Sequence, residues 1–254
     1  MKFFKMNNSL ISYRLFKRFE NVIAFTTTRK TFAEINSPHF TGGTNGNTNE
    51  NREKLASILG IQSNQLIFPR QTHTRCVSEI YGFPEAELED TDALVTNQQG
   101  ICLCVQTADC VPILLFDPKQ NVVASIHAGW RGTVKSIARE AVLKMQTTFH
   151  SSTKDILAVI GPSIGPEVYE VGDEVVKAVH KNIPNAEKTL HKNSSGKFHF
   201  NLWEANRQIL LDYGLVSENI EILGECTFQQ TEKYYSARRD GIETGRLVSG
   251  IMLV

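Results

Sequence analysis

The chain has 254 residues, of which 41% are hydrophobic, and its 27 basic and 27 acidic side chains give a formal net charge of zero at pH 7. Such a chain can bury a sizeable core within one domain, and its neutral charge argues against binding nucleic acid through the phosphates. The longest apolar runs are too short to cross a bilayer, and polar residues interrupt the N-terminal segment before a signal peptide could form. We therefore expect one domain over residues 1–254 of a cytoplasmic, monomeric protein without nucleic-acid or membrane partners.

The cysteines are odd in number and lack the paired spacing of a structural zinc site or of a disulfide framework. They are Cys76, Cys102, Cys104, Cys110 and Cys226. We expect reduced thiols, and all of them except Cys110 are expected to be packed side chains.

The first half of the chain predicts a helix followed by a series of strands. A polar, glycine-rich loop at 41–53 leads into a helix that ends near Leu59, with Gly60 as its stop signal. Short β-rich runs separated by Pro, Gly, Asn and Asp then predict strands at 66–68, 76–81, 92–96, 100–107, 111–117 and 122–128. Both faces of the 100–107 strand are apolar, so we expect it to be central in its sheet.

In the second half, helices interleave irregularly with strands. The apolar stripe at 133–149 predicts a helix with Thr133 as its N-cap. The remaining expected elements are strands at 156–161 and 220–225, a Gly/Pro loop at 161–172, helices at 173–181 and 202–213, and a polar C-terminal segment after residue 225. This order favours the α+β class, with mixed β-sheets and flanking helices in layers.

Two of the expected strands carry a thiol and an imidazole at adjoining ends. Cys110 opens the 111–117 run and His127 closes the 122–128 run. Successive strands usually lie side by side, so an antiparallel pair would bring these two residues within reach of one ion. His73, in a polar turn before another strand, could supply a third ligand and leave the fourth position of a zinc site open for catalysis. The alternatives are a hydrogen-bonded structural histidine and an inert buried thiol.

A second group of residues could bind an anion. Gly129 and Gly132 permit a tight turn, the helix that follows presents free N–H groups, and Arg131 adds a fork of donors. Further along the chain, Arg238, Arg239, Asp240 and Arg246 could add anion contacts near a pocket. In both places the alternative is a solvated or internally paired surface.

These segments together resemble the laccase-domain family of purine nucleoside phosphorylases, also called multicopper polyphenol oxidase or peptidoglycan editing factor. The resemblance is carried by "QTHTRCV", "DALVT", "VQTADCVPILLFD", "ASIHAGWRGTV", "IGPSIGPEVYEVG" and "SARRDGIETGR". It implies that His73, Cys110 and His127 are zinc ligands in an α+β fold with mixed sheets. Relatives often have Cys where Ser163 stands, which should leave metal binding intact. The loop at 41–53 also differs from that of relatives, and a loop that covers the pocket would change the substrate preference.

The resemblance implies phosphorolysis of adenosine, inosine, guanosine and methylthioadenosine, together with deamination of adenosine. For deamination, a zinc-activated water would attack the purine carbon that bears the amino group. No histidine here begins an H-x-E motif, so Asp109 is the candidate proton carrier, with a local turn cap as its alternative role. For phosphorolysis, Arg131, Arg52 and Arg239 are the candidate phosphate-binding residues.

Three other functions compete with this interpretation. Cys110 could be the nucleophile of a hydrolase or amidase, such as one that edits peptidoglycan precursors, with His127 as its base and Asp109 or His73 orienting the imidazole. A copper polyphenol oxidase is disfavoured because the seven histidines include no H-x-H pair, and one copper ion in the zinc site is the form of this alternative that the residues allow. A non-enzymatic binding module would turn over no nucleoside.

Overall fold

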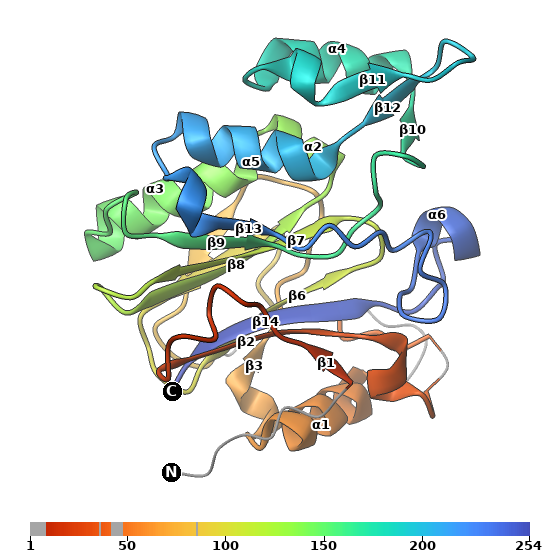
Figure 1. Cartoon of the computed structure of the whole chain (residues 1–254). Helices are drawn as coiled ribbons and strands as arrows, with labels where there is room; N and C mark the ends of the chain where they lie inside the picture. Colours follow the sequence, from red (N-terminus) through yellow and green to blue (C-terminus); the bar gives the residue numbers. More distant parts are fainter. Residues whose placement is uncertain (1–8, 36, 42–47, 85) are drawn as a thin grey trace.

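The computed structural model describes residues 9–35, 37–41, 48–84 and 86–254, and its described elements form stacked layers (Figure 1). Two large sheets lie face to face near the middle of the molecule. One has five strands, which in spatial order are β1 (Leu10–Ile11), β2 (Val22–Thr27), β14 (Leu247–Leu253), β6 (Cys102–Thr107) and β3 (Leu66–Ile67). The other has six, which are β13 (Ile220–Ile222), β9 (Leu157–Ile160), β7 (Val111–Asp117), β8 (Val122–Ala128), β5 (Ala93–Thr96) and β4 (Val77–Glu79).

A small third sheet and the helices complete the layers. The small sheet contains β10 (Glu170–Val171), β12 (Phe198–Phe200) and β11 (Leu190–Lys192). The helices are α1 (Thr48–Leu59), α2 (Trp130–Val134), α3 (Ile137–Phe149), α4 (Asp173–Asn182), α5 (Leu202–Asp212) and α6 (Ala237–Asp240). Short 3-10 turns occur at Arg29–Phe32, Ser63–Gln65, Ala186–Lys188 and Ser217–Asn219.

The layers are held together by apolar faces on both sides of each large sheet. Between the sheets, side chains such as Leu103 and Ile251 meet Leu114 and Val159 in one buried cluster. The outer face of the five-stranded sheet packs against α1, and the outer face of the six-stranded sheet packs against α3 and α5. Helix α4 and the small sheet lie beyond α5 in Figure 1. Because both faces of the central strands are covered, their sequences are apolar almost throughout.

The α+β class with mixed sheets is confirmed. Strand β14 is antiparallel to β2 and β6, whereas β3 runs parallel to β6 and β4 runs parallel to β5. Strands β7 and β8 have the expected bounds, and β6 has a neighbour on each side, as its two apolar faces predicted. No helix in the described part of the chain has the length and apolar character needed to span a bilayer.

Four expectations about local structure are wrong. The segment 133–149 is not one helix, because Ser136 adopts a left-handed backbone with φ 59° and separates α2 from α3. Thr133 is therefore no N-cap; it lies buried within α2 and accepts a hydrogen bond from Asn206 at 3.1 Å. The C-terminal segment is not polar throughout, since β14 occupies the centre of the five-stranded sheet. Cys76 is exposed rather than packed.

Candidate metal centre and active-site cavity

The pairing of β7 with β8 brings Cys110 beside His127. The two strands are antiparallel, with Pro112 opposite His127 and Val111 opposite Ala128. Cys110 directly precedes β7 and so lies next to the end of β8, as the strand argument predicted. The His127 side chain is buried, and Cys110 is half-buried.

His73 joins them from the loop that connects β3 to β4. Its backbone has a left-handed φ of 63°, which turns the chain toward the end of β8. One ligand atom from each of His73, Cys110 and His127 lies within 4.8 Å of the others. The Cys110 Sγ to His73 Nε2 distance is 3.7 Å, close to the separation of about 3.5 Å that tetrahedral zinc imposes on a sulfur and a nitrogen ligand. Among the described residues, this is the one group of three or more such side chains close enough to hold a metal ion.

Gly129 leaves the space into which this group fits. A Cβ atom at this position would stand 2.7 Å from His73 Cδ2 and 2.9 Å from Cys110 Sγ, closer than real Cβ atoms approach. The glycine of "HAGWRG" is thus required by the close approach of the backbone to the ligand group. The donor set and this cradle both fit a bound metal ion.

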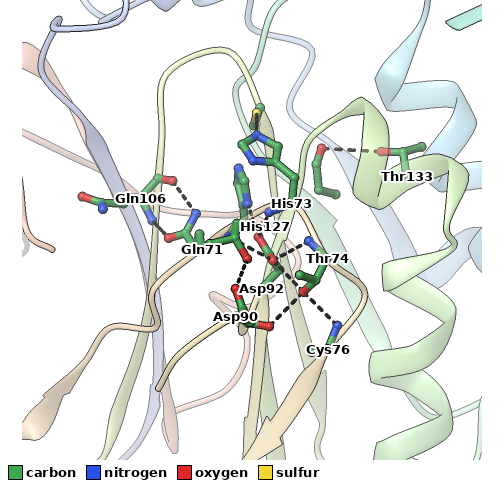
Figure 2. Close-up of polar contacts among 12 residues, drawn as sticks. Gln71, His73, Thr74, Cys76, Asp90, Asp92, Gln106, His127 and Thr133 are labelled. Carbon is green, nitrogen blue, oxygen red and sulfur yellow. Dashed lines mark hydrogen bonds and ion pairs between the residues drawn. The ribbon is translucent and has the colours of Figure 1, made fainter. Parts of the chain in front are cut away.

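Asp92 supports the ligand group from beneath, a role that was not predicted from the sequence (Figure 2). Its carboxylate lies 2.7 Å from Nδ1 of His127, so that nitrogen donates and Nε2 is left for a metal. The same carboxylate accepts from the backbone N–H groups of His73 and Thr74 and from the Thr74 hydroxyl. One buried acid therefore orients one imidazole and fixes the turn that carries the other.

The electrostatics of the group favour a thiolate. Burial raises the pKa of a thiol, but the facing imidazoles of His127 and His73 outweigh it and lower the pKa of Cys110 to about 6. Burial likewise disfavours the charged form of His127, yet the Cys110 sulfur and the Asp92 carboxylate raise its pKa to about 9. Burial acts against ionised Asp92 too, but His127 and Thr74 lower its pKa to about 2. A metal that binds here displaces the protons held by this group.

The three ligand candidates line a cavity of about 510 Å³. An amide pair forms part of its wall (Figure 2): Gln71 Nε2 donates to the Gln106 carbonyl and the Gln106 N–H donates to Gln71 Oε1, both at 2.8 Å. The other described lining residues are His39, Thr41, Thr107, Ala108, Ala237, Ile242, Glu243 and Arg246. Residues 42–47 of the loop expected to cover the pocket lie outside the described residues. A cavity of this size accommodates a small-molecule substrate next to the ligand group.

The structure places three of the predicted phosphate-binding residues away from this wall. Arg131 is exposed, with its guanidinium 4.3 Å from the centre of the Trp130 ring. Arg52 donates to the Phe40 carbonyl at 2.7 Å and lines a different cavity. The Arg239 guanidinium donates hydrogen bonds to three backbone carbonyls and to the Asp240 carboxylate. Of the arginines singled out from the sequence, Arg246 lines the cavity.

Asp109 has a different environment from the one expected of a proton carrier. Its carboxylate accepts from the Thr227 hydroxyl at 2.6 Å, the Ser236 hydroxyl at 3.0 Å and the Arg238 N–H at 2.7 Å. It does not cap local N–H groups, as the alternative role required, and it is absent from the described cavity wall. We conclude that Asp109 ties the turn before Cys110 to two distant segments.

Sequence reasoning missed Asp92, Gln71 and Gln106 as site residues. Asp92 opens the expected strand at 92–96, and an acid at a strand end beside the His127 strand is the signal that could have found it. Gln71 lies in the same short motif as His73, and Gln106 ends the central strand just before Cys110. Ser163 is buried and outside the ligand group, as expected from its position in the sequence.

Comparisons with known proteins find relatives over most of the chain. The family model described as multi-copper polyphenol oxidoreductase laccase matches residues 24–254. A purine nucleoside phosphorylase of Bacteroides thetaiotaomicron is 36% identical over 261 residues, covering 96% of each chain. The adenosine deaminase RL5 of an unknown prokaryotic organism is 39% identical over 250 residues, covering 92% of this chain and 95% of its own.

Two solved structures have a similar fold over nearly the whole chain. The crystal structure of the Bacillus licheniformis hypothetical protein YfiH superimposes with a TM-score of 0.87 at 30% identity, covering 98% of this chain and 97% of its own. That of YlmD from Geobacillus stearothermophilus gives a TM-score of 0.83 at 29% identity, with 93% of both chains covered. The chain therefore belongs to the multi-copper polyphenol oxidoreductase laccase family, whose relatives named above include enzymes that act on purine nucleosides.

Proposed function

We propose that the protein is a zinc-dependent purine nucleoside phosphorylase, acting on adenosine, inosine, guanosine and methylthioadenosine, that also deaminates adenosine. The observation that carries the proposal is the convergence of His73, Cys110 and His127 on the wall of a cavity of substrate size. The names of relatives at 34 to 39% identity support the two activities.

The donor set favours zinc over copper. Two imidazoles and one thiolate suit zinc, and three protein ligands leave one position for catalysis. A multicopper centre needs many more imidazoles, and the described residues hold one such ligand group. One copper ion in the same group is the alternative, and metal analysis of protein purified without added metal distinguishes the two.

In phosphorolysis, a phosphate oxygen forms a bond to C1′ of the ribose while the bond from C1′ to the purine nitrogen breaks. The bonding electron pair leaves with the purine, which takes up a proton, and ribose 1-phosphate is the second product. The chain must bind the nucleoside, hold the phosphate on the side of C1′ opposite the base, and exclude bulk water. The Gln71–Gln106 pair gives the cavity a fixed polar wall against which the nucleoside binds.

In deamination, water replaces the amino group of adenosine, with ammonia and inosine as products. When bound, zinc supplies a Lewis acid that lowers the pKa of water. The chain's own contribution is to hold the ligand group rigidly, through Asp92 and the Gly129 cradle, and to carry a proton to the departing amine. Since Asp109 is fully engaged by three donors, we assign this proton transfer to Glu243, the one carboxylate among the described lining residues.

The decisive experiment incubates zinc-replete protein with adenosine, with and without inorganic phosphate, and identifies the products. Adenine with ribose 1-phosphate, formed only when phosphate is present, establishes phosphorolysis. Inosine formed without phosphate establishes deamination. Recovery of unchanged adenosine under both conditions, from protein that carries stoichiometric zinc, refutes the proposal.

A second candidate function draws on the contact between Asp92 and His127. A thiolate, an imidazole and a buried carboxylate in series resemble the arrangement of a cysteine hydrolase, with Asp92 in the orienting role that had been expected of Asp109 or His73. Hydrolysis of an amide, as in the editing of peptidoglycan precursors, would then proceed without metal. Metal-free protein that hydrolyses amides and loses this activity when Cys110 is alkylated would favour this function.

We also propose that the protein is a single domain over residues 1–254 and acts as a cytoplasmic monomer, without nucleic-acid or membrane partners. The formal net charge of zero supports this, because it provides no general attraction to nucleic acid. Light scattering of the purified protein, with and without added RNA, tests the monomer and the absence of complexes.

A further inference from the structure

Arg246 is the one arginine or lysine among the described residues that line the cavity beside the ligand group. Its position follows from the sheet register, since Leu247 at the start of β14 pairs with Thr107 at the end of β6. The chain leaving β6 continues through Ala108 to Cys110. The residue just before β14 and the residues just after β6 therefore share one end of the five-stranded sheet, beside the ligand group.

The backbone of Arg246 is held in place from two sides. Its N–H donates to the Pro38 carbonyl at 2.8 Å. At the preceding residue, Gly245, a Cβ atom would stand 2.8 Å from Pro38 Cδ and from the ring of Tyr235. The close approach of these side chains requires glycine there and leaves little freedom for the segment to move.

Backbone carbonyls hold two of the three nitrogens of the guanidinium group. Nη1 donates to the carbonyls of Thr244 and Gly245, and Nη2 donates to the Ile242 carbonyl at 2.8 Å. Nε has no acceptor among the described residues, and Arg246 forms no ion pair with any of them. In a guanidinium, the Nε–H and one N–H of Nη2 point the same way and form a fork that fits two oxygens of a phosphate.

The surroundings leave the positive charge of Arg246 available. Its nearest acidic neighbour in the cavity wall, Glu243, is exposed at the rim, where water screens its charge. Arg246 itself is half-buried, so an anion that reaches it interacts more strongly than at an open surface. Burial and the positive charge of Arg246 lower the pKa of His39 in the same cavity wall, which disfavours a second positive charge there.

We propose that the open Nε edge of Arg246 binds the phosphate that attacks C1′ in phosphorolysis. This inference rests on the proposed function. Two phosphate oxygens accept from the fork, and a third forms the bond to C1′ as the purine leaves with the electrons of the broken bond and gains a proton. Deamination uses no phosphate and does not depend on this contact.

The test compares Arg246→Gln and Arg246→Lys with the wild-type protein, each with its zinc content and thermal unfolding measured. For Arg246→Gln we expect kcat/KM for phosphate to fall about 100-fold or more, as on removal of one transition-state donor. Arg246→Lys retains the positive charge without the fork of donors, so its kcat/KM for phosphate should lie between those of wild type and Arg246→Gln. Deamination of adenosine is measured beside it, because Nη1 and Nη2 of Arg246 also hold the segment that carries Glu243; we expect the fall in kcat/KM for phosphate to exceed any fall in deamination by at least about tenfold, with unchanged zinc content. Arg70→Gln is the control, because Arg70 is exposed and paired with Glu89.

An unchanged kcat/KM for phosphate in Arg246→Gln would overturn the inference, as would an equal loss of deamination and phosphorolysis. A fall in kcat/KM for phosphate in Arg131→Gln, with no fall in Arg246→Gln, would show that Arg131 binds the phosphate instead. If the wild-type protein catalyses no phosphorolysis, the proposed function fails. Calorimetric titration with inorganic phosphate then decides the anion site by itself. Binding that is lost in Arg246→Gln supports it, and equal or absent binding in both proteins overturns it.

Discussion

The Asp92 carboxylate contacts Nδ1 of His127 at 2.7 Å and thereby determines which nitrogen of that ring faces the cavity. Removal of a partner that orients a metal-binding histidine typically lowers metal affinity about 10- to 100-fold. We expect Asp92→Asn to weaken zinc binding by this factor, because an amide holds both the imidazole and the turn at His73 less firmly. Competition with a chromophoric chelator measures the affinity.

Asp90→Asn is the matched control for this change. Asp90 is exposed and accepts from the Thr72 hydroxyl at 2.8 Å, two residues away from Asp92 in the same loop. Its φ of 46° is one that asparagine tolerates well. Equal zinc affinities for the two variants would show that Asp92 has no special role.

Gly129→Ala should abolish metal binding without unfolding the protein. The added methyl group would collide with both His73 and Cys110, and these side chains can move apart only by giving up their common position. Zinc content by mass spectrometry and far-UV circular dichroism measure the two effects. Gly172→Ala is the control, since a Cβ at Gly172 meets nothing within 4 Å. Full zinc occupancy in Gly129→Ala would contradict the proposed cradle.

Cys110→Ala should lower both activities by at least about 100-fold, the upper end of what a lost metal-orienting partner costs, since here a ligand itself is removed. In wild-type protein, zinc should protect Cys110 from iodoacetamide, because coordination occupies the sulfur. The exposed Cys76 serves as an internal control that is alkylated with or without zinc. Equal alkylation of Cys110 in zinc-loaded and zinc-free protein would argue that its sulfur is no ligand.

Asp109→Asn separates a positioning role from proton transfer. Loss of a hydrogen-bonded carboxylate is expected to lower the free energy of unfolding by about 2 kcal/mol. Removal of a general acid would instead lower the deamination rate about 100-fold or more in the folded protein. We expect the first effect, measured by urea unfolding, with deamination within about tenfold of wild type at a temperature where the variant is folded.

Thr227→Val provides the comparison for Asp109. It removes one of the three donors to the carboxylate while the acid remains. If both variants lower the free energy of unfolding and largely retain deamination, Asp109 has a positioning role. A rate loss confined to Asp109→Asn, with a changed pH profile, would restore Asp109 as the proton carrier.

The sequence was most informative where the local pattern alone determines the structure. The apolar runs of β7 and β8 are bounded by turn residues, and antiparallel pairing of such neighbours follows from the short connection between them. The meeting of Cys110 and His127 could therefore be predicted. The fold class followed in the same way from the order of strands and helices.

Contacts between distant segments could not be read from local pattern. Asp92 acts on a histidine 35 residues away, and only the pairing of β5 with β8 makes them neighbours. Strand β14 was missed because Ser249 and Gly250 interrupt its apolar run. The structure explains that glycine, since a Cβ there would stand 2.6 Å from Phe25 Cζ. The sequence did not indicate which arginine lines the cavity, because spacing does not reveal which way a long side chain extends.

The two halves of the proposed site belong to different sheets. Cys110 and His127 are carried by the six-stranded sheet, whereas Arg246 precedes the central strand of the five-stranded sheet. The separation between the metal group and the anion-binding edge is thus determined by how the sheets seat against each other through residues such as Leu114 and Ile251. Interdigitated side chains resist sliding of one sheet over the other. The apolar layer between the sheets therefore keeps the ligand group and Arg246 at a constant separation.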